Sequence, residues 1–244
     1  MSSPHIAAVS FDPALDIEDM SFSWNNREPL LMIRKFSVQC GERVLLQGAS
    51  GSGKSTLLAL MAGVMLPSSG CISVLGRNLT TLSSSRRDTL RASHVGFVFQ
   101  MFNLLPFLSA RDNVLLPCRF SAVRDARARA TRSRVEEADH LIASLGLDPS
   151  RLASTPVAEL SIGQQQRVAA ARALIGSPEL LLADEPTSAL DPATRDSFLQ
   201  LLFSECARTL TSVVLVSHDP SLSVLFDRSV RLEDLNRPTV PQAV

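Results

Sequence analysis

The stretch Gly48-Ala-Ser-Gly-Ser-Gly53-Lys54-Ser55 matches the phosphate-binding pattern G-x-x-x-x-G-K-[ST] at every position. The apolar run 43–47 before it predicts a buried strand, and the run 56–62 after it predicts a helix. This context matters because the helix N-terminus and the loop's backbone N–H groups then face a single point. The sequence therefore predicts an α/β fold with a phosphate site here, rather than an ordinary Gly/Ser turn.

Each residue type in this loop suits the binding of a nucleotide. The glycines let the backbone N–H groups turn inward around a phosphate. Lys54 is expected to reach the β- and γ-phosphates, and the hydroxyl of Ser55 is expected to ligate Mg²⁺. The predicted nucleotide contacts of this segment are Gly48, Ala49, Ser50, Gly51, Ser52, Gly53, Lys54, Ser55 and Thr56.

The composition argues against several classes of protein. The chain has 24 basic and 24 acidic residues and a net charge of +0, so a general nucleic-acid binder is not expected. The four scattered cysteines form no C-x-x-C pair, which favours a reducing cytosol over a disulfide framework or a zinc site. No apolar run approaches the ~18 residues that span a bilayer, and no signal peptide is expected. Any membrane role must therefore come through a partner.

The order of apolar patterns along the chain indicates an interrupted α/β core. Two apolar runs, 17–24 and 31–38, are divided by a polar turn and predict antiparallel strands. From about 110 to 158, Arg, Ala and Glu dominate at helical spacing. One apolar stripe of this block consists of Val135, Ala138, Leu141, Ile142 and Leu145. Further strands are expected at 71–75, 94–99, 180–183, 213–217 and 229–232, with a helix at 192–207.

These patterns predict one domain over residues 16–235. A helical subdomain, about 101–175, is inserted in the α/β core. Residues 1–15 and 236–244 are expected to be flexible ends.

A second half of the site is predicted in the segment 179–187, where a buried strand ends in two acids. Strands of α/β sheets point their carboxyl ends at ligands. Asp184 is expected to hold Mg²⁺ through water, and Glu185 is placed to polarise a water in line with the γ-phosphate. Two acids that cap a helix are the alternative for this pair.

The segment Leu160-Ser161-Ile162-Gly163-Gln164-Gln-Gln-Arg167 opens a predicted helix with Ser161 as its N-cap. It resembles the LSGGQ signature motif of ABC ATPases. The resemblance covers residues 16–235 and implies an α/β P-loop NTPase core of ABC-ATPase type, with an antiparallel β subdomain and an inserted helical subdomain. Ile162 departs from the motif by replacing its first glycine, which narrows the approach to the phosphate.

The resemblance implies roles for further residues. Gln100 resembles the Q-loop glutamine that touches Mg²⁺ and the attacking water, and His218 resembles the switch histidine that contacts the γ-phosphate. The stretch 188–191 resembles the D-loop. Trp24 lies where the family places an aromatic that stacks on adenine. Ser161, Gly163 and Gln164 are expected to act on the nucleotide of a second subunit, which implies a head-to-tail dimer.

The resemblance is to the branch that contains the ATPases of lipoprotein release, macrolide export and the cell-division membrane complex. It implies an ATPase that uses ATP and Mg²⁺ and drives an integral-membrane permease, in a homodimer or with a homologous subunit. It also implies a place on the cytoplasmic face of the cell membrane, held there by the permease. A soluble ABC ATPase of a cytosolic assembly, without a permease, is the alternative.

Two surface features complete the expectations. The loop Met101–Pro106 is unusually apolar. The resemblance implies that it lines the groove that receives the permease's coupling helix, with subdomain packing as the alternative. The basic run Arg124, Arg127, Arg129, Arg132 and Arg134 is expected to be a solvated helix face, with lipid headgroup contact as its alternative.

Overall fold

The computed structural model describes residues 12–25, 28–188 and 190–236. An antiparallel sheet of order β2-β1-β4-β5 forms its first layer. Its strands are β1 Leu15–Phe22, β2 Leu31–Val38, β4 Ser69–Val74 and β5 Arg77–Asn78. Along β1 and β2, residues that face the core are buried and the central residues between them are exposed, as expected of a sheet with one solvated face.

The second sheet is parallel and has the order β6-β7-β8-β3-β9. Its strands are β6 Val95–Val98, β7 Leu180–Asp184, β8 Ser212–Ser217, β3 Arg43–Gln47 and β9 Arg228–Arg231. The central strands are apolar on both faces, because each face is covered: Leu46 packs in one core cluster and Leu45 in the other. All five strands run in one direction, so their carboxyl ends share one edge.

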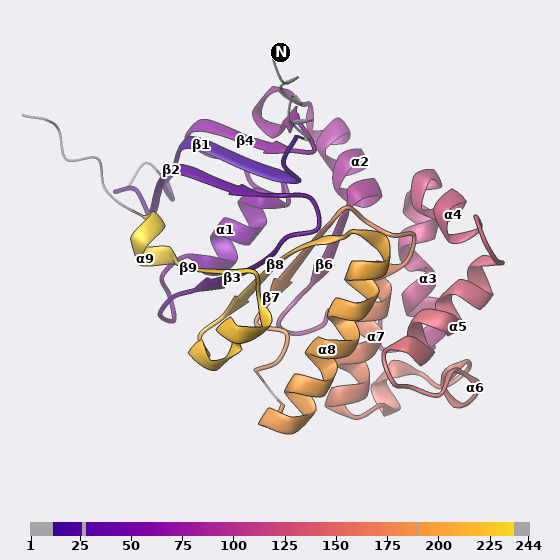
Figure 1. Ribbon diagram of the computed structural model, residues 1–244. Helices are drawn as coiled ribbons and strands as arrows, with labels where there is room; N and C mark the ends of the chain where they lie inside the picture. The colour runs from indigo at the N-terminus through magenta and orange to yellow at the C-terminus, as the bar shows by residue number, and fades with distance from the viewer. Residues whose placement is uncertain (1–11, 26–27, 189, 237–244) are drawn as a thin grey trace, which may run out of the picture.

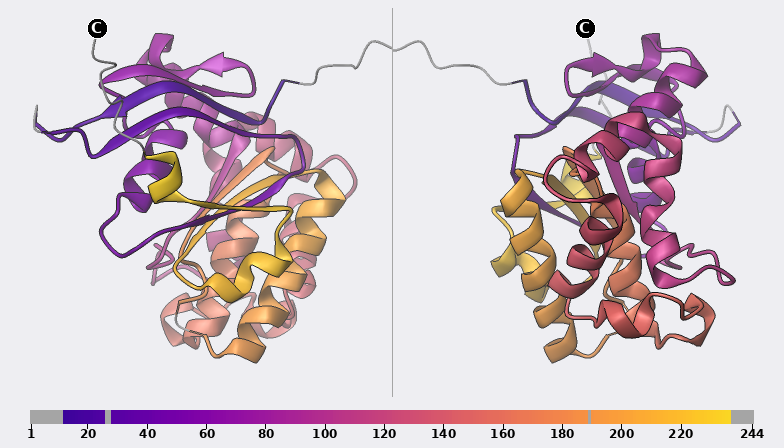
Figure 2. Two further views of the ribbon diagram at one scale, coloured as in Figure 1. Left: turned by 60° about the vertical axis from the view of Figure 1, so that its left-hand side comes forward. Right: turned by 90° about the vertical axis from the view of Figure 1, so that its right-hand side faces the viewer.

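The helices complete a layered arrangement (Figures 1 and 2). Helix α1 Lys54–Met61 lies between the two sheets, and α7 Ile162–Leu174 and α8 Pro192–Thr209 cover the other face of the parallel sheet. A helical lobe projects from the sheet between β6 and β7 in the chain. It contains α3 Ala110–Phe120, α4 Ala122–Ala128, α5 Arg134–Ser144 and α6 Pro149–Leu152. The remaining helices are α2 Ser84–His94 and α9 Leu232–Leu235.

The fold class predicted from the sequence is confirmed, but several boundaries differ. Strand β1 begins at the fully buried Leu15 and ends at Phe22, so Trp24 lies beyond the strand. His94 ends α2 rather than starting β6. Val135 is 40% exposed and does not belong to the buried stripe of α5. These differences arise because packing against neighbouring elements fixes strand and helix ends more tightly than local pattern does.

The C-terminal boundary also differs from the prediction. Asn236 belongs to the predicted flexible tail, yet its side chain forms two hydrogen bonds at the start of β2, one to Met32 and one to Leu30 just before the strand. Its Oδ1 accepts from the Met32 backbone N–H at 2.6 Å, and its Nδ2 donates to the Leu30 carbonyl at 2.9 Å. Of the predicted ends 1–15 and 236–244, residues 1–11 and 237–244 lie outside the described residues, as do the turn residues 26 and 27 and Ala189 of the predicted D-loop. Ala14 and Leu15, at the other limit of the predicted N-terminal end, are buried.

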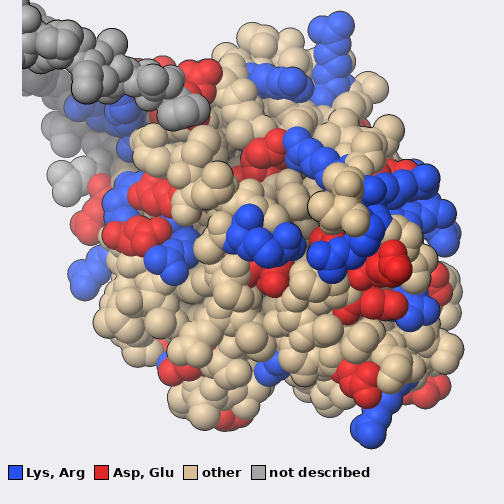
Figure 3. All heavy atoms as spheres, turned by 45° about the vertical axis from the view of Figure 1, so that its right-hand side comes forward, with Lys and Arg blue, Asp and Glu red and all other residues tan. Residues whose placement is uncertain are grey.

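The basic run in and after α4 is not a simple solvated face. Arg124 is 2% exposed, which contradicts the prediction for that residue. Arg127 pairs with Glu179, Arg129 and Arg134 pair with Asp125, and Arg132 pairs with Glu137. Figure 3 shows basic and acidic side chains interspersed over one face of the molecule. Each exposed member of this run thus has an acidic neighbour, which leaves little unbalanced charge for a lipid surface.

No helix within the described ranges is long and apolar enough to cross a bilayer. All four cysteines are free thiols, two of them buried.

Candidate functional site

Four strand ends of the parallel sheet carry the predicted site residues. The phosphate loop 48–53 connects β3 to α1, and Gln100 follows β6. Asp184 is the last residue of β7, and His218 follows β8 directly. Because β7, β8 and β3 are parallel neighbours, these residues from distant parts of the chain gather at one edge.

A cavity of about 480 Å³ lies at this edge. The described residues that line it are Trp24, Leu30, Ser50, Gly51, Gly53, Lys54, Ser55, Thr56, Gln100 and Glu185. It therefore unites the phosphate loop with predicted site residues from three other segments. Asp184 and His218 are not among its lining residues, although they end β7 and follow β8 at the same edge. Ser161, Gly163 and Gln164 do not line it either, and they lie at the exposed start of α7 rather than at a strand end.

The phosphate loop has a backbone that only small residues allow. Gly51 and Gly53 have φ angles of 77° and 102°, in the left-handed region that side chains disfavour. At Gly48, an added Cβ would lie 2.9 Å from Ser52 Oγ, so this glycine permits the loop to close on itself. Within the described part of the chain, the buried Ser52 Oγ has no hydrogen-bond partner. A buried hydroxyl without a partner fits a loop that contacts a bound anion.

Lys54 is held inside the loop. Its side chain is 6% exposed, and Nζ donates to the carbonyl oxygens of Gly48 and Ala49, at 2.8 Å each. The Glu185 carboxylate lies 3.9 Å from the same ammonium. Contacts within the protein therefore hold the Lys54 ammonium at the phosphate loop.

The two acids after β7 occupy different environments. Burial raises the pKa of Asp184, and hydrogen bonding to the Ser55 side chain opposes this rise. Glu185 has a left-handed backbone, with φ 42°, which turns its side chain away from the strand direction. Its Oε2 lies 3.0 Å from His218 Nδ1. Asp184 thus faces the Ser55 hydroxyl, and Glu185 faces the exposed imidazole of His218.

The oxygen donors at this site suit a magnesium ion better than a metal ion that is held entirely by protein side chains. Among the described residues there is no cluster of three or more His, Cys, Asp or Glu side chains that could hold a metal ion. Asp184 and the Ser55 hydroxyl supply two oxygen donors beside the loop. Mg²⁺ suits such a site because it keeps several waters and takes its other ligands from phosphates.

Trp24 and Leu30 form the apolar end of the cavity. Trp24 is 50% exposed, and its ring meets the Phe22 ring edge-on at a centroid distance of 5.2 Å. An indole supported on one side and open on the other can stack on a planar ring. Leu30 was missed by sequence reasoning, since nothing in its local pattern distinguishes it from other strand-edge leucines.

The signature segment begins α7 with an exposed capping box. Ser161 Oγ accepts from the Gln164 N–H at 3.3 Å, and Gln164 Oε1 accepts from the Ser161 N–H at 2.9 Å. Ile162 is 58% exposed. At Gly163 an added Cβ would meet only one atom, Leu190 Cδ2 at 3.8 Å. This fold therefore does not itself require glycine at 163, which fits a position that an external partner approaches closely.

Two contacts near the site escaped sequence reasoning. Glu233 of α9 accepts a hydrogen bond from the Ala49 N–H at 3.3 Å, across 184 positions of sequence. Arg195 of α8 forms an ion pair with Asp219, the residue after His218. No local sequence motif predicts either contact, because both depend on how the C-terminal elements pack.

Comparison with known proteins identifies the family. Residues 31–188 match the family model described as ABC transporter, which is more than half of the chain. The chain belongs to the ABC transporter family. The ATP-binding subunits of this family hydrolyse ATP, and this chain is such an ATPase subunit.

Relatives of this ABC ATPase include two that it covers nearly end to end. It is 46% identical over 195 residues to the uncharacterized ABC transporter ATP-binding protein YbbA of Escherichia coli (strain K12), covering 80% of this chain and 82% of YbbA. It is 40% identical over 219 residues to the lipoprotein-releasing system ATP-binding protein LolD of Xanthomonas campestris pv. campestris (strain 8004), covering 89% and 88%.

A third relative is longer. The macrolide export ATP-binding/permease protein MacB of Rhodopirellula baltica is 40% identical over 206 residues, which are 84% of this chain and 29% of MacB. Among solved structures, the dimeric post-hydrolysis state of the ATP-binding cassette MJ0796 with ADP and Pi has a TM-score of 0.79. It is 32% identical, and the match covers 94% of this chain and 100% of that chain.

Proposed function

We propose that this ABC ATPase forms a head-to-tail dimer that hydrolyses ATP between its subunits and drives a separate integral-membrane permease. The observation that carries the dimer is the separation within one chain: the signature residues are absent from the cavity that the phosphate loop lines. A second subunit that presents its own signature helix completes the site. The dimeric state of the solved cassette MJ0796 supports this arrangement.

Within this site each residue has a distinct task. Lys54 and the loop N–H groups hold the β- and γ-phosphates, and Trp24 stacks on the adenine. Asp184, Ser55 and Gln100 hold Mg²⁺, which supplies charge neutralisation at the phosphates. Ser161, Gly163 and Gln164 of the opposite subunit approach the same phosphates from the other side.

Glu185 and His218 serve the hydrolytic step. Glu185 orients and polarises the attacking water and accepts its proton as the water oxygen bonds to the γ-phosphorus. The bond from the γ-phosphorus to the ADP oxygen then breaks, which yields ADP and phosphate. The 3.0 Å contact between His218 Nδ1 and Glu185 Oε2 supports this pairing, because the imidazole holds the carboxylate that lines the cavity.

The permease partner is supported by the relatives. The name of MacB joins an ATP-binding and a permease activity in one protein, of which this chain matches 29%. LolD is named as the ATP-binding protein of a lipoprotein-releasing system. We infer that a permease partner holds this ATPase at the cytoplasmic face of the membrane.

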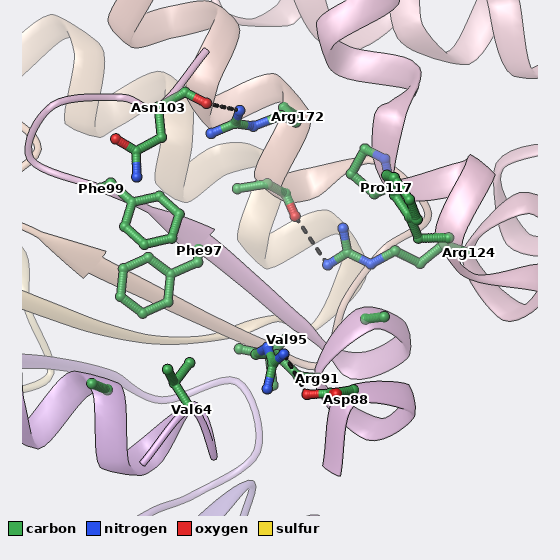
Figure 4. Close-up of a pocket in the computed structure, with 14 residues that line it drawn as sticks. Val64, Asp88, Arg91, Val95, Phe97, Phe99, Asn103, Pro117, Arg124 and Arg172 are labelled. Carbon is green, nitrogen blue, oxygen red and sulfur yellow. Dashed lines mark hydrogen bonds and ion pairs between the residues drawn. The ribbon is translucent and has the colours of Figure 1, made fainter. Parts of the chain in front are cut away.

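A second cavity, of about 500 Å³, is the proposed docking groove for that permease. Its apolar lining includes Val64, Val95, Phe97, Phe99 and Phe120 (Figure 4). Phe97 and Phe99 stack on each other at a ring-centroid distance of 4.2 Å. Of the loop Met101–Pro106, only Asn103 lines this groove, while Phe102 and Leu104 pack against the core, so subdomain packing accounts for those two side chains.

The test is affinity purification of tagged Glu185→Gln from solubilised membranes of the native host, in the presence of ATP. We expect a permease to co-purify, because a dimer that cannot hydrolyse ATP stays closed on its partner. Tagged Lys54→Ala serves as the matched control, since it should not be trapped by ATP. Recovery of soluble proteins alone would favour the ATPase of a cytosolic assembly and contradict the permease proposal.

A further inference from the structure

The docking groove contains an imbalance of charge that its apolar lining does not explain. Three arginines line it, Arg91, Arg124 and Arg172, and Asp88 is the single acid among its described lining residues. Asp88 already pairs with Arg91, through Oδ1 at 2.7 Å from Nη2. Arg172 donates to the backbone carbonyls of Asn103 and Phe102, at 2.6 Å each. The groove therefore carries a net positive charge beside stacked aromatic rings.

Arg124 is the least compensated of these cations. Its side chain is 2% exposed and makes one hydrogen bond, from Nη2 to the Ala173 carbonyl at 3.2 Å. Its buried Nε finds no partner within the ranges the structure describes. Burial lowers the pKa of Arg124 to about 10. A guanidinium out of water is stable only when counter-charge or hydrogen bonds replace its hydration, and here that replacement is incomplete.

Arg91, which also lines the groove, shows the same deficit. Its Nη1 is buried and, like Arg124 Nε, has no hydrogen-bond partner in the described part of the chain. The two arginines come from different elements, α2 and α4, and both are among the lining residues drawn in Figure 4. Two independent segments thus leave unpaired N–H groups at one apolar groove.

A structural role accounts for part of the burial of Arg124, but it does not account for the unpaired N–H groups of both Arg124 and Arg91. Ala173 lies in the last turn of α7, so the guanidinium compensates the negative end of that helix. That contact uses Nη2 alone and leaves Nε without a partner. The contact with α7 does not explain Arg91. Among the described residues, the Arg91 side chain bonds Asp88 and forms no hydrogen bond or ion pair with α7.

We infer that the permease segment that docks in this groove carries at least one carboxylate, from Asp or Glu, that accepts hydrogen bonds from the unpaired N–H groups of Arg91 and Arg124. The apolar side chains of the same segment pack on Phe97 and Phe99. This inference rests on the proposed function and adds the chemistry of the partner. A carboxylate matches a guanidinium fork in geometry and charge, and an apolar neighbour excludes the water that would weaken the pair.

The test measures binding of the co-purified permease, in detergent, to immobilised Glu185→Gln carrying a second substitution. Arg91→Gln and Arg124→Gln each remove a charge from the groove. Arg86→Gln is the matched control, because Arg86 is an exposed residue of the same helix as Arg91 and does not line the groove. We expect the dissociation constant to rise by about tenfold or more for Arg91→Gln and Arg124→Gln, and to stay near the parent value for Arg86→Gln.

Thermal melting and ATP binding of every variant establish that it is folded. If Arg124→Gln unfolds, Arg91→Gln still decides the question, because Arg91 is partly exposed and is not needed to fill the core. A charge exchange then identifies the partner residue: Arg91→Glu should regain binding when the matching permease acid is changed to arginine.

Three results would overturn the inference. Parent-like affinity of Arg91→Gln would show that the groove binds through apolar contact alone. Binding of the parent protein to anionic lipid vesicles without permease, lost in Arg91→Gln, would assign the groove to phospholipid headgroups. If the affinity purification with Glu185→Gln recovers no permease, the proposed function itself is contradicted. That outcome differs from the first result, in which a permease is recovered but binds Arg91→Gln as tightly as the parent.

Discussion

At the scale of single residues, the site separates two adjacent acids by backbone geometry. Asp184 completes β7, while the left-handed backbone of Glu185 redirects its side chain toward His218 and Lys54. Such a conformation costs a non-glycine residue of the order of 1 kcal/mol and is typically kept where function requires it. Neighbouring residues on a regular strand would point to opposite faces, so this turn lets both acids serve one site.

We expect Glu185→Gln to lower kcat for ATP hydrolysis by about 10²-fold or more, with ATP binding retained, because the amide cannot accept the proton of the attacking water. Steady-state phosphate release and nucleotide binding measure the two effects separately. Glu18→Gln, an exposed change on β1, is the control. A rate within twofold (roughly) of the parent would remove Glu185 as the base.

At the scale of elements, ion pairs join segments that the sequence holds far apart. Arg195 of α8 contacts both Asp219, beside His218, and Asp196 on its own helix. Because α8 begins directly after Asp191, this arginine connects the end of the D-loop to the loop that carries the switch histidine. The helix and the histidine loop are therefore expected to move together.

Arg195→Ala should lower kcat by about 2- to 30-fold while KM for ATP changes little, since the nucleotide contacts are intact and only the histidine loop is released. Arg195→Lys should restore part of the rate by retaining the charge. Steady-state kinetics in both variants provide the measurement. An equal loss in KM and kcat, without rescue by lysine, would indicate a general structural defect instead.

A second junction, between α2, α4 and the start of β7, makes stability depend on pH. Desolvation by itself would raise the pKa of Glu179, but hydrogen bonds from His94 and Arg127 outweigh it and lower the pKa to about 2. A lowered pKa means that this stabilisation is complete above pH ~4.5, the unfolded value, and is lost as pH falls toward 2. With the carboxylate 34% exposed, solvent screening limits its size to about 1 kcal/mol.

We therefore expect the free energy of unfolding to fall more steeply between pH ~4.5 and pH ~2 in the parent protein than in Glu179→Gln. Urea unfolding followed by circular dichroism at several pH values measures both slopes. Parallel slopes would show that the Glu179 junction contributes nothing to acid sensitivity.

At the scale of the whole molecule, the chain presents two half-sites on separate surfaces. The phosphate loop lines one cavity, and the exposed start of α7 carries Ser161 and Gly163 elsewhere. Two such chains in head-to-tail contact contain two complete sites, each made from both subunits. If the proposed arrangement is correct, hydrolysis is a property of the dimer.

Mixing two inactive variants should restore activity. Lys54→Ala removes a phosphate contact, and Ser161→Arg blocks the signature surface of an otherwise complete chain. Their heterodimer has one intact site, so about a quarter of parent activity is expected after random pairing. The control is a mixture of Lys54→Ala with the double variant that carries both Lys54→Ala and Ser161→Arg. This mixture should stay inactive, because no chain in it has an intact phosphate loop. Equal inactivity of both mixtures would contradict the shared site.

The local structure around the predicted nucleotide site could be predicted because the main parts of that site are contiguous in sequence. The phosphate loop needs a strand, glycines at set positions and a helix start, all within about a dozen residues of local pattern. The Asp184-Glu185 pair follows an apolar strand in the same readable way. Composition and periodicity likewise sufficed for the α/β class and for a block of helices between two halves of the core.

The tertiary structure alone decided which distant residues meet. The burial of Arg124, the placement of Leu30 in the nucleotide cavity and the contact of Glu233 with Ala49 follow from packing between elements. A side chain's neighbours in space are not a function of its neighbours in sequence, since folding brings together segments separated by up to 206 positions, as in the bond from Asn236 to Leu30. The sequence by itself thus determined the local chemistry of phosphate binding, and the packed fold determined the environment in which each charge acts.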